Sequence, residues 1–249
     1  ASVPVRVRAR LPGHAGVGGV DRGRPGAEVE VAAGPVDPPR IRLDPVRLGP
    51  FSIQYIRMAH SIPEANALAI TVKDVGTILH TGDWKIDHDP VAGNTTDENE
   101  LRALGDAGLL AVVGDSTNAM VEGHSGSEAE VRQSLTALLR GVRGRVAVTC
   151  FASNVARLES VAVAAHEAGR SVALVGRSLR NIDAAARECG YLRDLPPFLT
   201  EDDVDDVPDD NILMLVTGSQ GEPRSALSRI AMDTHPRVAL GEGDTVVFS

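Results

Sequence analysis

The sequence predicts an α/β protein in which a mainly parallel sheet occupies the second half of the chain. From residue 127 onward, short continuous apolar runs alternate with amphipathic helical segments, a pattern typical of parallel strands joined by helices. Earlier in the chain, residues 67–72 and 77–79 form two strand-like runs around a Gly-containing turn, which predicts a β-hairpin. Apolar residues make up 43% of the chain and aromatic residues 3%, so the core is expected to be aliphatic.

The spacing of apolar residues places the other elements. In chain order we expect a strand over 51–56, the hairpin, a polar loop over 87–99, a helix over 100–108, a buried strand over 109–113, a helix over 127–142, a strand over 145–150, a helix from 153 to 169, a strand over 172–175, a helix over 179–189, a strand over 212–216 and a helix over 223–232. Ser127 and Glu130 form a capping box, and Ser153 is expected to cap the helix that follows it.

Residues 1–50 differ in composition from the rest of the chain. They hold eight of the fifteen prolines, eight glycines and eight arginines, with no lysine and no clear period. We assign no packed structure to them. Disorder, a poorly matched end or a reading-frame error in a GC-rich gene would each give this composition. The missing initial Met suggests a processed chain or a fragment.

Charge and cysteine content narrow the function classes. The formal net charge is −9, with acidic residues dense over 201–206, so the chain lacks the basic footprint of a nucleic-acid binder. This counts only mildly against a nuclease, because a local groove can be positive on an acidic protein. No apolar run approaches the ~20 residues that span a membrane. Cys150 and Cys189 lie in apolar patterns and are expected to be buried, reduced thiols of a cytoplasmic protein.

His60 and Asp83 are the first candidates for a metal site. Each lies at the edge of a strand-like run, and the hairpin between them could return Asp83 to the neighbourhood of His60. Taken singly, the histidine could be an ordinary surface or core residue and the aspartate a turn residue. His80 is a further possible ligand. The other histidines are expected to face solvent; they are His14, His88, His124, His166 and His235.

Three turns that follow predicted parallel strands could bind phosphate. Ser153 and Asn154 can cap a helix, or the free amides there can bind an anion. The turns at 176–178 and 217–223 occupy equivalent positions but match no phosphate-binding fingerprint. Ligands collect outside the carboxyl ends of parallel strands, so the three turns together are more suggestive than any one of them.

Seven segments, in this order, resemble the bacterial ribonuclease J family, whose members are metallo-β-lactamase-fold nucleases with an inserted β-CASP domain. The segments are HSIPEANALAI (60–70), TILHTGDWKID (77–87), GDSTNA (114–119), FASNVARLESV (151–161), VALVGRS (172–178), LVTGSQGEPRSALSRIA (215–231) and GDTVVFS (243–249). The resemblance covers residues 48–249. It implies a partial metallo-β-lactamase αββα domain over 1–118, with 1–47 poorly matched or disordered. A β-CASP domain with a mainly parallel, Rossmann-like sheet would follow over 119–249, incomplete at its C-terminal end.

The resemblance also implies site residues. His60 would be a metal-binding histidine and Asp83 the aspartate that bridges two Zn²⁺ ions. Asp115 would be the acidic residue of the first β-CASP motif, beside the metal centre, with Asp83 and Asp115 acting in catalysis. Ser153, Asn154 and Val155 would contact RNA near a pocket for a 5′-terminal phosphate.

The implied activity is that of a zinc-dependent ribonuclease, a 5′–3′ exonuclease with endonuclease activity, in RNA decay and maturation, including rRNA processing. Such enzymes prefer RNA with a 5′-monophosphate, are cytoplasmic and are homo-oligomers, dimeric or tetrameric. The family's H-x-H-x-D-H cassette, later histidine motifs and C-terminal domain are not found in this sequence. We therefore expect a fragment that binds zinc weakly and does not cleave RNA by itself.

Two alternatives stay open. A β-CASP hydrolase could act on DNA or another phosphoester, because no residue can be assigned to recognition of the RNA 2′-OH. Alternatively, the chain could be a non-catalytic α/β nucleotide-binding or interaction module in which His60 and Asp83 are structural.

Overall fold

The computed structural model describes residues 5–7, 29–31, 44–123 and 125–249, and the chain divides into two compact units, Ala1–Arg40 and Ile41–Ser249. In the first unit, β1 (Val5–Val7) pairs antiparallel with β2 (Val29–Val31). The other expectations for residues 1–43 lie outside the described residues. All that follows concerns the second unit.

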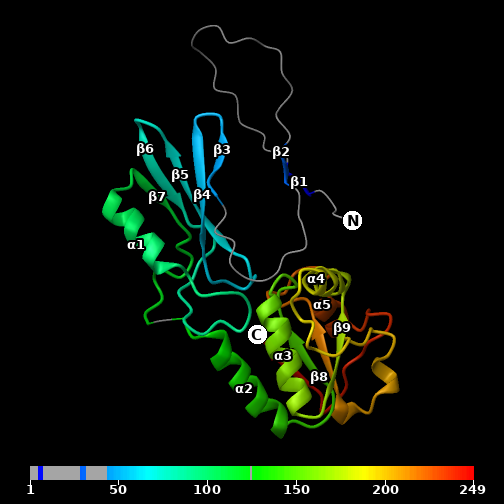
Figure 1. Cartoon of the computed structure of the whole chain (residues 1–249). Helices are drawn as coiled ribbons and strands as arrows, with labels where there is room; N and C mark the ends of the chain where they lie inside the picture. The colour runs from blue at the N-terminus through cyan, green and yellow to red at the C-terminus, as the bar shows by residue number, and fades with distance from the viewer. Residues whose placement is uncertain (1–4, 8–28, 32–43, 124) are drawn as a thin grey trace. The chain divides into compact units, whose positions relative to one another are not determined.

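A five-stranded sheet is built from residues 46–113 (Figure 1). Its strands are β3 (Val46–Leu48), β4 (Phe51–Arg57), β5 (Asn66–Val72), β6 (Gly76–His80) and β7 (Ala111–Val113), adjacent in that order. Strands β3 to β6 are antiparallel to their neighbours, and β7 is parallel to β6. The predicted strand at 51–56 and the predicted hairpin are confirmed. The hairpin turn places Asp74 at φ 62° and Gly76 at φ 139°, and only glycine adopts the second value readily.

The helix α1 (Glu98–Ala107) packs through Leu101 and Leu104 against one face of this sheet. The core there uses small side chains, since Ala67 and Ala69 of β5 are both buried. Asp97 caps the helix by accepting a hydrogen bond from the backbone N–H of Glu100 at 3.1 Å. The predicted helix at 100–108 is confirmed, beginning two residues earlier.

The expectation that residues 109–113 form a buried strand is wrong. Strand β7 is exposed along its length, with Val112 60% and Val113 50% exposed. It lies at the edge of the sheet and pairs only with β6, and no described segment packs over it closely enough to bury its side chains. An apolar run indicates a strand, but its burial depends on what covers it.

A four-stranded parallel sheet occupies the second half of the described chain. Its strands are β8 (Val146–Thr149), β9 (Ser171–Val175), β10 (Ile212–Val216) and β11 (Thr245–Phe248), in the order β11-β8-β10-β9. All its pairings are parallel. This confirms the predicted α/β class and adds β11 as an edge strand that the apolar pattern did not predict. Each described strand belongs to one sheet only. The exact domain boundary at residue 118 stays a prediction.

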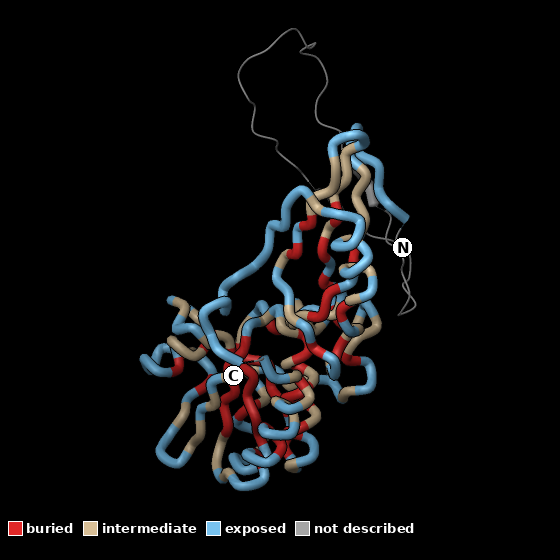
Figure 2. The backbone as a smooth tube through the Cα atoms, turned by 90° about the vertical axis from the view of Figure 1, so that its left-hand side faces the viewer, coloured by how far each residue is buried: buried red, intermediate tan, exposed pale blue. Residues whose placement is uncertain are grey.

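Helices cover both faces of the parallel sheet. They are α2 (Glu128–Gly141), α3 (Val155–Glu167), α4 (Arg177–Glu188) and α5 (Ala226–Ala231). Alternate strand residues such as Val148 pack with α2, α3 and α4, and the intervening ones such as Met214 pack with α5. Buried residues are concentrated in these strands (Figure 2). Among the described helices, none is long and apolar enough to cross a membrane.

Helix starts were predicted with mixed success. The capping box is confirmed, because Ser127 accepts from the Glu130 N–H and Glu130 accepts from the Ser127 N–H, both at 3.1 Å. Ser153 does not cap α3. Asn154 does, with its Oδ1 accepting from the Arg157 N–H at 2.9 Å, because the helix begins one residue later than expected. The helix expected over 223–232 begins only at Ala226.

The two cysteines lie in different environments. Cys150 is buried as expected, and burial raises the pKa of its thiol to about 12. Cys189 is exposed at the end of α4, so the expectation of burial is wrong there. The helical spacing placed Cys189 on the apolar face, but the face ends one turn earlier, at Ala186.

A buried guanidinium holds the amino ends of the parallel strands together. Arg170 is only 5% exposed and donates to the backbone carbonyls of Gly144 at 2.8 Å, Ile212 at 3.0 Å and Val142 at 2.7 Å. These carbonyls belong to the segments leading into β8 and β10 and to the end of α2. One side chain therefore supplies donors to the start of β10 and to the connection between α2 and β8, where the buried Ile212 carbonyl and two partly buried carbonyls accept.

We expect Arg170→Met to lower the free energy of unfolding by about 2–4 kcal/mol, because one buried and two partly buried carbonyls lose their donor. Urea denaturation followed by circular dichroism measures this. The matched control is Arg143→Met, since that side chain is 91% exposed and reaches only Asp210 at 3.4 Å. An equal decrease in the free energy of unfolding in both variants would show that the Arg170 hydrogen bonds do not stabilise the fold more than an exposed arginine does.

Candidate functional site

Strand direction brings the three candidate metal and catalytic residues to one edge of the five-stranded sheet. Because β4 and β6 are both antiparallel to β5, and β7 is parallel to β6, all three run in the same direction. Their carboxyl ends therefore lie at the same edge. His60 and Asp83 each follow a strand end by three residues, and Asp115 by two. We call these three residues the candidate metal edge.

Backbone and side-chain contacts join the loops that carry these residues. The Lys85 N–H donates to the Ala59 carbonyl at 3.3 Å, which ties the segment after β6 to the segment after β4. The Asp115 N–H donates to Thr81 Oγ1 at 3.3 Å, and Trp84 Nε1 donates to the Asp115 carbonyl at 3.1 Å. These hydrogen bonds hold together the three loops that carry His60, Asp83 and Asp115, although the residues are far apart in the sequence.

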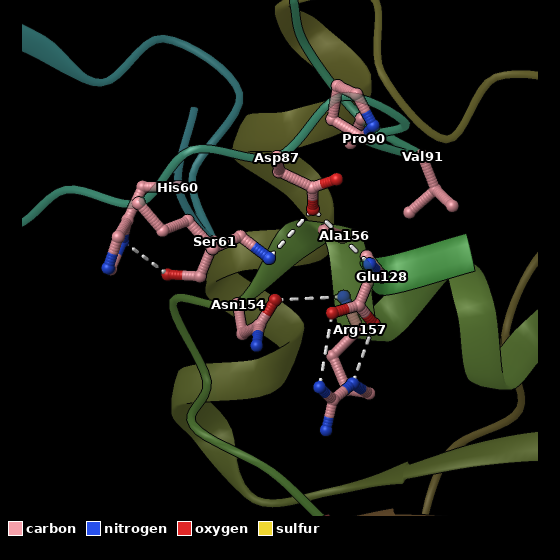
Figure 3. Close-up of a pocket in the computed structure, with 11 residues that line it drawn as sticks. His60, Ser61, Asp87, Pro90, Val91, Glu128, Asn154, Ala156 and Arg157 are labelled. Carbon is pink, nitrogen blue, oxygen red and sulfur yellow. Dashed lines mark hydrogen bonds and ion pairs between the residues drawn. The ribbon is translucent and has the colours of Figure 1, made fainter. Parts of the chain in front are cut away.

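The candidate metal edge carries an ionised carboxylate, which would attract a cation. The hydroxyl of Thr117 donates to Asp115, and its N–H donates at 2.9 Å, so the pKa of that carboxyl falls below its usual range. A smaller electrostatic contribution from His60 acts in the same direction on the pKa of Asp115. Ser61 Oγ lies 3.1 Å from His60 Nδ1 (Figure 3), and no contact to Nε2 is present among the described residues. Asp83 and Asp115 are exposed and His60 is half-buried.

The candidate metal edge does not by itself fit a zinc pair. Within residues 44–123 and 125–249, no group of three or more His, Cys, Asp or Glu side chains could hold a metal ion. A dinuclear zinc site requires several imidazoles and a bridging carboxylate. His80 adds nothing in this arrangement, since its Nδ1 accepts from the Gly82 N–H at 3.2 Å. The described residues supply part of a donor set only.

The remaining histidines lie away from this edge. His88 is an exposed partner of Glu98 at 3.7 Å, and His166 is exposed on α3. His235 was expected to face solvent but is half-buried, and its Nδ1 accepts from the Val238 N–H at 3.1 Å. Burial lowers the pKa of His235, so it serves as a neutral acceptor. His14 and His124 lie outside the described residues.

The turn at 153–155 forms the amino end of α3, where its three residues differ in exposure. Ser153 is exposed, and Asn154 is half-buried as the helix cap. Val155 is 7% exposed and packs in the core, so only its backbone could meet a ligand. The turns at 176–178 and 217–223 follow β9 and β10 at the same sheet edge.

One cavity of about 150 Å³ joins the two candidate regions (Figure 3). It lies between the loops that follow β4 and β6 and the amino ends of α2 and α3. Its polar lining includes His60, Ser61, Lys85, Asp87, Glu128, Asn154 and Arg157. The structure therefore brings His60 and Asn154 to a common cavity, while Asp83, Asp115, Ser153 and Val155 are not among its lining residues.

Sequence reasoning missed the charged residues of this cavity. Lys85, Asp87, Glu128 and Arg157 all occur in or beside segments already recognised, but no local pattern marks them as partners. Glu128 follows a capping serine and was read only as part of the first helical turn. Its partner Arg157 lies 29 residues further along the chain.

Comparisons with known proteins give one consistent family. A family model described as "Ribonuclease J, beta-CASP domain" matches residues 143–249. Ribonuclease J of Sinorhizobium meliloti is 48% identical over 206 residues, covering 83% of this chain and 36% of that protein. Ribonuclease J of Thermus thermophilus is 40% identical over 199 residues, covering 80% and 35%. The chain thus spans about a third of the length of these curated relatives.

A solved structure supports the fold independently. The crystal structure of a protein of unknown function from Enterococcus faecalis matches with a TM-score of 0.51 and 18% sequence identity, covering 82% of this chain and 55% of that one. At this identity the match concerns the fold alone. The family model and the curated relatives, without this match, support one conclusion: the chain corresponds to part of a ribonuclease J.

Proposed function

We propose that this chain forms part of a zinc-dependent ribonuclease of the ribonuclease J type. The observation that carries the proposal is the cavity shared by His60, from the candidate metal edge, and Asn154, from the amino end of α3. A phosphodiester substrate needs a cation to bind its charge and a second contact to orient the strand. In the proposal, His60 on one side of the cavity helps to bind the cation, and Asn154 on the other side contacts the strand.

His60 and Asp83 are proposed as donors to a site for two Zn²⁺ ions, with Asp115 beside it in catalysis. Imidazole nitrogen and carboxylate oxygen are ordinary zinc ligands. The donors still needed must come from outside residues 44–123 and 125–249, so we assign no step of cleavage to the residues described. The ionised state of Asp115 suits a role next to a cation.

The Asn154 side-chain amide and the Ser153 hydroxyl, at the positive end of the α3 dipole, are proposed to hold an RNA phosphate. A helix amino end binds anions through unpaired N–H groups and the helix dipole. Ser153 is exposed beside this position, and Val155, proposed as part of the same RNA-contacting turn, is the first residue of α3. A 5′-terminal monophosphate would place the most negative charge of the strand there, which supports a preference for such ends.

The finer features of the activity are part of the same proposal. They comprise 5′–3′ exonuclease and endonuclease action, roles in RNA decay and maturation including rRNA processing, a cytoplasmic location and a homo-oligomeric assembly. Their support is the family relationship. The net charge of −9 means that RNA must be attracted by a local site rather than by the overall field.

The metal part of the proposal predicts that this chain binds zinc weakly and that His60→Ala and Asp83→Asn each lower its zinc affinity about tenfold or more. Competition with a chromophoric chelator measures the affinity. His166→Ala is the control, because that side chain is exposed on α3 away from the edge. Unchanged affinity in both edge variants would refute their role, and robust zinc-dependent RNA cleavage by the chain alone would contradict the incomplete donor set.

The RNA part predicts that Asn154→Asp lowers affinity for 5′-monophosphorylated RNA about tenfold, because the side chain still caps α3 but repels phosphate. Fluorescence anisotropy at low salt measures binding, with a DNA strand of matched sequence as a second ligand. Ser225→Ala is the control, since it removes the cap of α5, where Ser225 accepts from the Ser228 N–H at 3.2 Å. Equal RNA affinity of Asn154→Asp and wild type would exclude this turn from the site.

A further inference from the structure

Four charged side chains line the cavity (Figure 3), and the contact among them that joins the two sheets is the one between Asp87 and the Glu128 N–H. Lys85 Nζ lies 2.8 Å from Asp87 Oδ2, and the same oxygen accepts from the Glu128 N–H at 3.3 Å. Glu128 in turn receives two hydrogen bonds from Arg157, at 2.7 Å from Nε and 3.1 Å from Nη2. Two of these residues follow β6, and the others lie in the first turns of α2 and α3. We call this set the latch.

The latch is buried and its acidic groups are satisfied. Asp87 is 3% and Glu128 7% exposed. Asp87 Oδ1 accepts from the Asp89 N–H at 3.0 Å, so both its oxygens have donors. Burial opposes the ionisation of Asp87, but the hydrogen bonds from Lys85, Asp89 and Glu128 outweigh it and hold the pKa of this carboxyl below its usual range. Asp87 therefore stays charged within the interface.

Such a network favours one arrangement of its partners over others. A buried ion pair adds little net stability, because desolvation offsets the attraction, but removal of one member leaves an uncompensated charge. The two sheets can therefore depart from this arrangement only by exposing or orphaning charged groups. Lys85 lies two residues after Asp83, and Arg157 three residues after Asn154. The latch thus runs from the candidate metal edge to the amino end of α3.

We propose that Asp87, Glu128 and Arg157 are positioning residues, which fix the amino end of α3 at one distance from the candidate metal edge. The consequence for substrate rests on the proposed function: an RNA strand whose phosphate is held by α3 would reach the edge in one register. The fixed arrangement of the two sheets does not depend on that function.

Two further contacts lie beside the latch. The Ala156 N–H donates to the Ser61 carbonyl at 3.4 Å, and the Tyr191 hydroxyl donates to Glu64 Oε1 at 3.2 Å. Because these contacts persist when the latch is broken, its loss should loosen the arrangement of the sheets rather than separate them.

A distance measurement between the sheets tests the proposal directly. Spin labels can be attached to native Cys189, which is exposed, and to Val75→Cys in the hairpin turn, where the side chain is 64% exposed. Cys150 is buried with a raised thiol pKa and should not react. We expect a narrow distance distribution for the otherwise native chain and one about twofold wider for Asp87→Ala and Asp87→Asn, because loosely joined domains move relative to one another.

The control is Glu159→Gln, which breaks the 2.9 Å ion pair with Arg132 between α2 and α3. That pair lies within the part built on the parallel sheet, so the distribution should stay narrow. Circular dichroism establishes that each variant is folded, and Asp87→Asn is the conservative variant should Asp87→Ala fail to fold. Distributions as narrow as that of the native arrangement in both latch variants would overturn the proposal.

Nucleotide binding distinguishes loss of the fixed distance between α3 and the candidate metal edge from damage to the α3 end itself. With Zn²⁺ added in excess to occupy the edge, uridine 5′-monophosphate reaches only the α3 end, whereas a 5′-monophosphorylated RNA of about six nucleotides can also reach the edge. In the latch variants we expect the oligonucleotide to bind about tenfold more weakly and the mononucleotide to be unaffected, because two linked contacts lose their common geometry. Equal losses for both ligands, or no loss for either, would refute the positioning role. If the wild-type chain binds neither ligand, the proposed RNA site fails, while the distance distributions still decide whether the latch fixes the sheets.

Discussion

The direction of three strands is the constraint on which the candidate site depends. The hairpin of β5 and β6 reverses the chain, so that β6 runs the same way as β4, and β7 then adds in parallel to β6. The hairpin register pairs Ile70 with Ile78 and keeps Leu79 on the face that packs with α1. A slip by one residue would turn Leu79 outward and move Asp83 away from the end of β4. The hydrophobic pattern that buries the sheet therefore also aligns the charged residues at its edge.

The helices that follow the parallel strands also contribute polar groups to this cavity, at the amino end of α3. Strands β8, β9 and β10 are buried on both faces, so polar contacts are concentrated in the connections at their ends. At the carboxyl end of β8 the chain turns into α3, and Asn154 satisfies one of the free N–H groups there. The opposite ends are held by Arg170. The rigid core thus leaves the amino end of α3 as a defined polar surface facing the five-stranded sheet.

Local patterns in the sequence predicted the elements that depend on local physics. Alternation predicted β4, the Gly-containing turn predicted the hairpin, and the Ser127 capping box predicted the start of α2. The failures concern properties that depend on distant partners. The burial of β7 requires a covering element, and the exposure of Cys189 depends on where the face of α4 meets its neighbours. The latch joins Asp87 to Glu128 across 41 residues, and no spacing rule indicates such a pair.

Under the proposed function, the same latch also determines how the cavity would attract RNA. The lysine and arginine side chains that line it, Lys85 and Arg157, are already paired with buried carboxylates. An entering phosphate therefore meets the Asn154 amide and the imidazole of His60, rather than free cations. Such hydrogen-bonding groups select a phosphate by its position and orientation more than by its charge. This is how a chain of net charge −9 can present a selective phosphate contact, provided that the two sheets are held at a fixed distance.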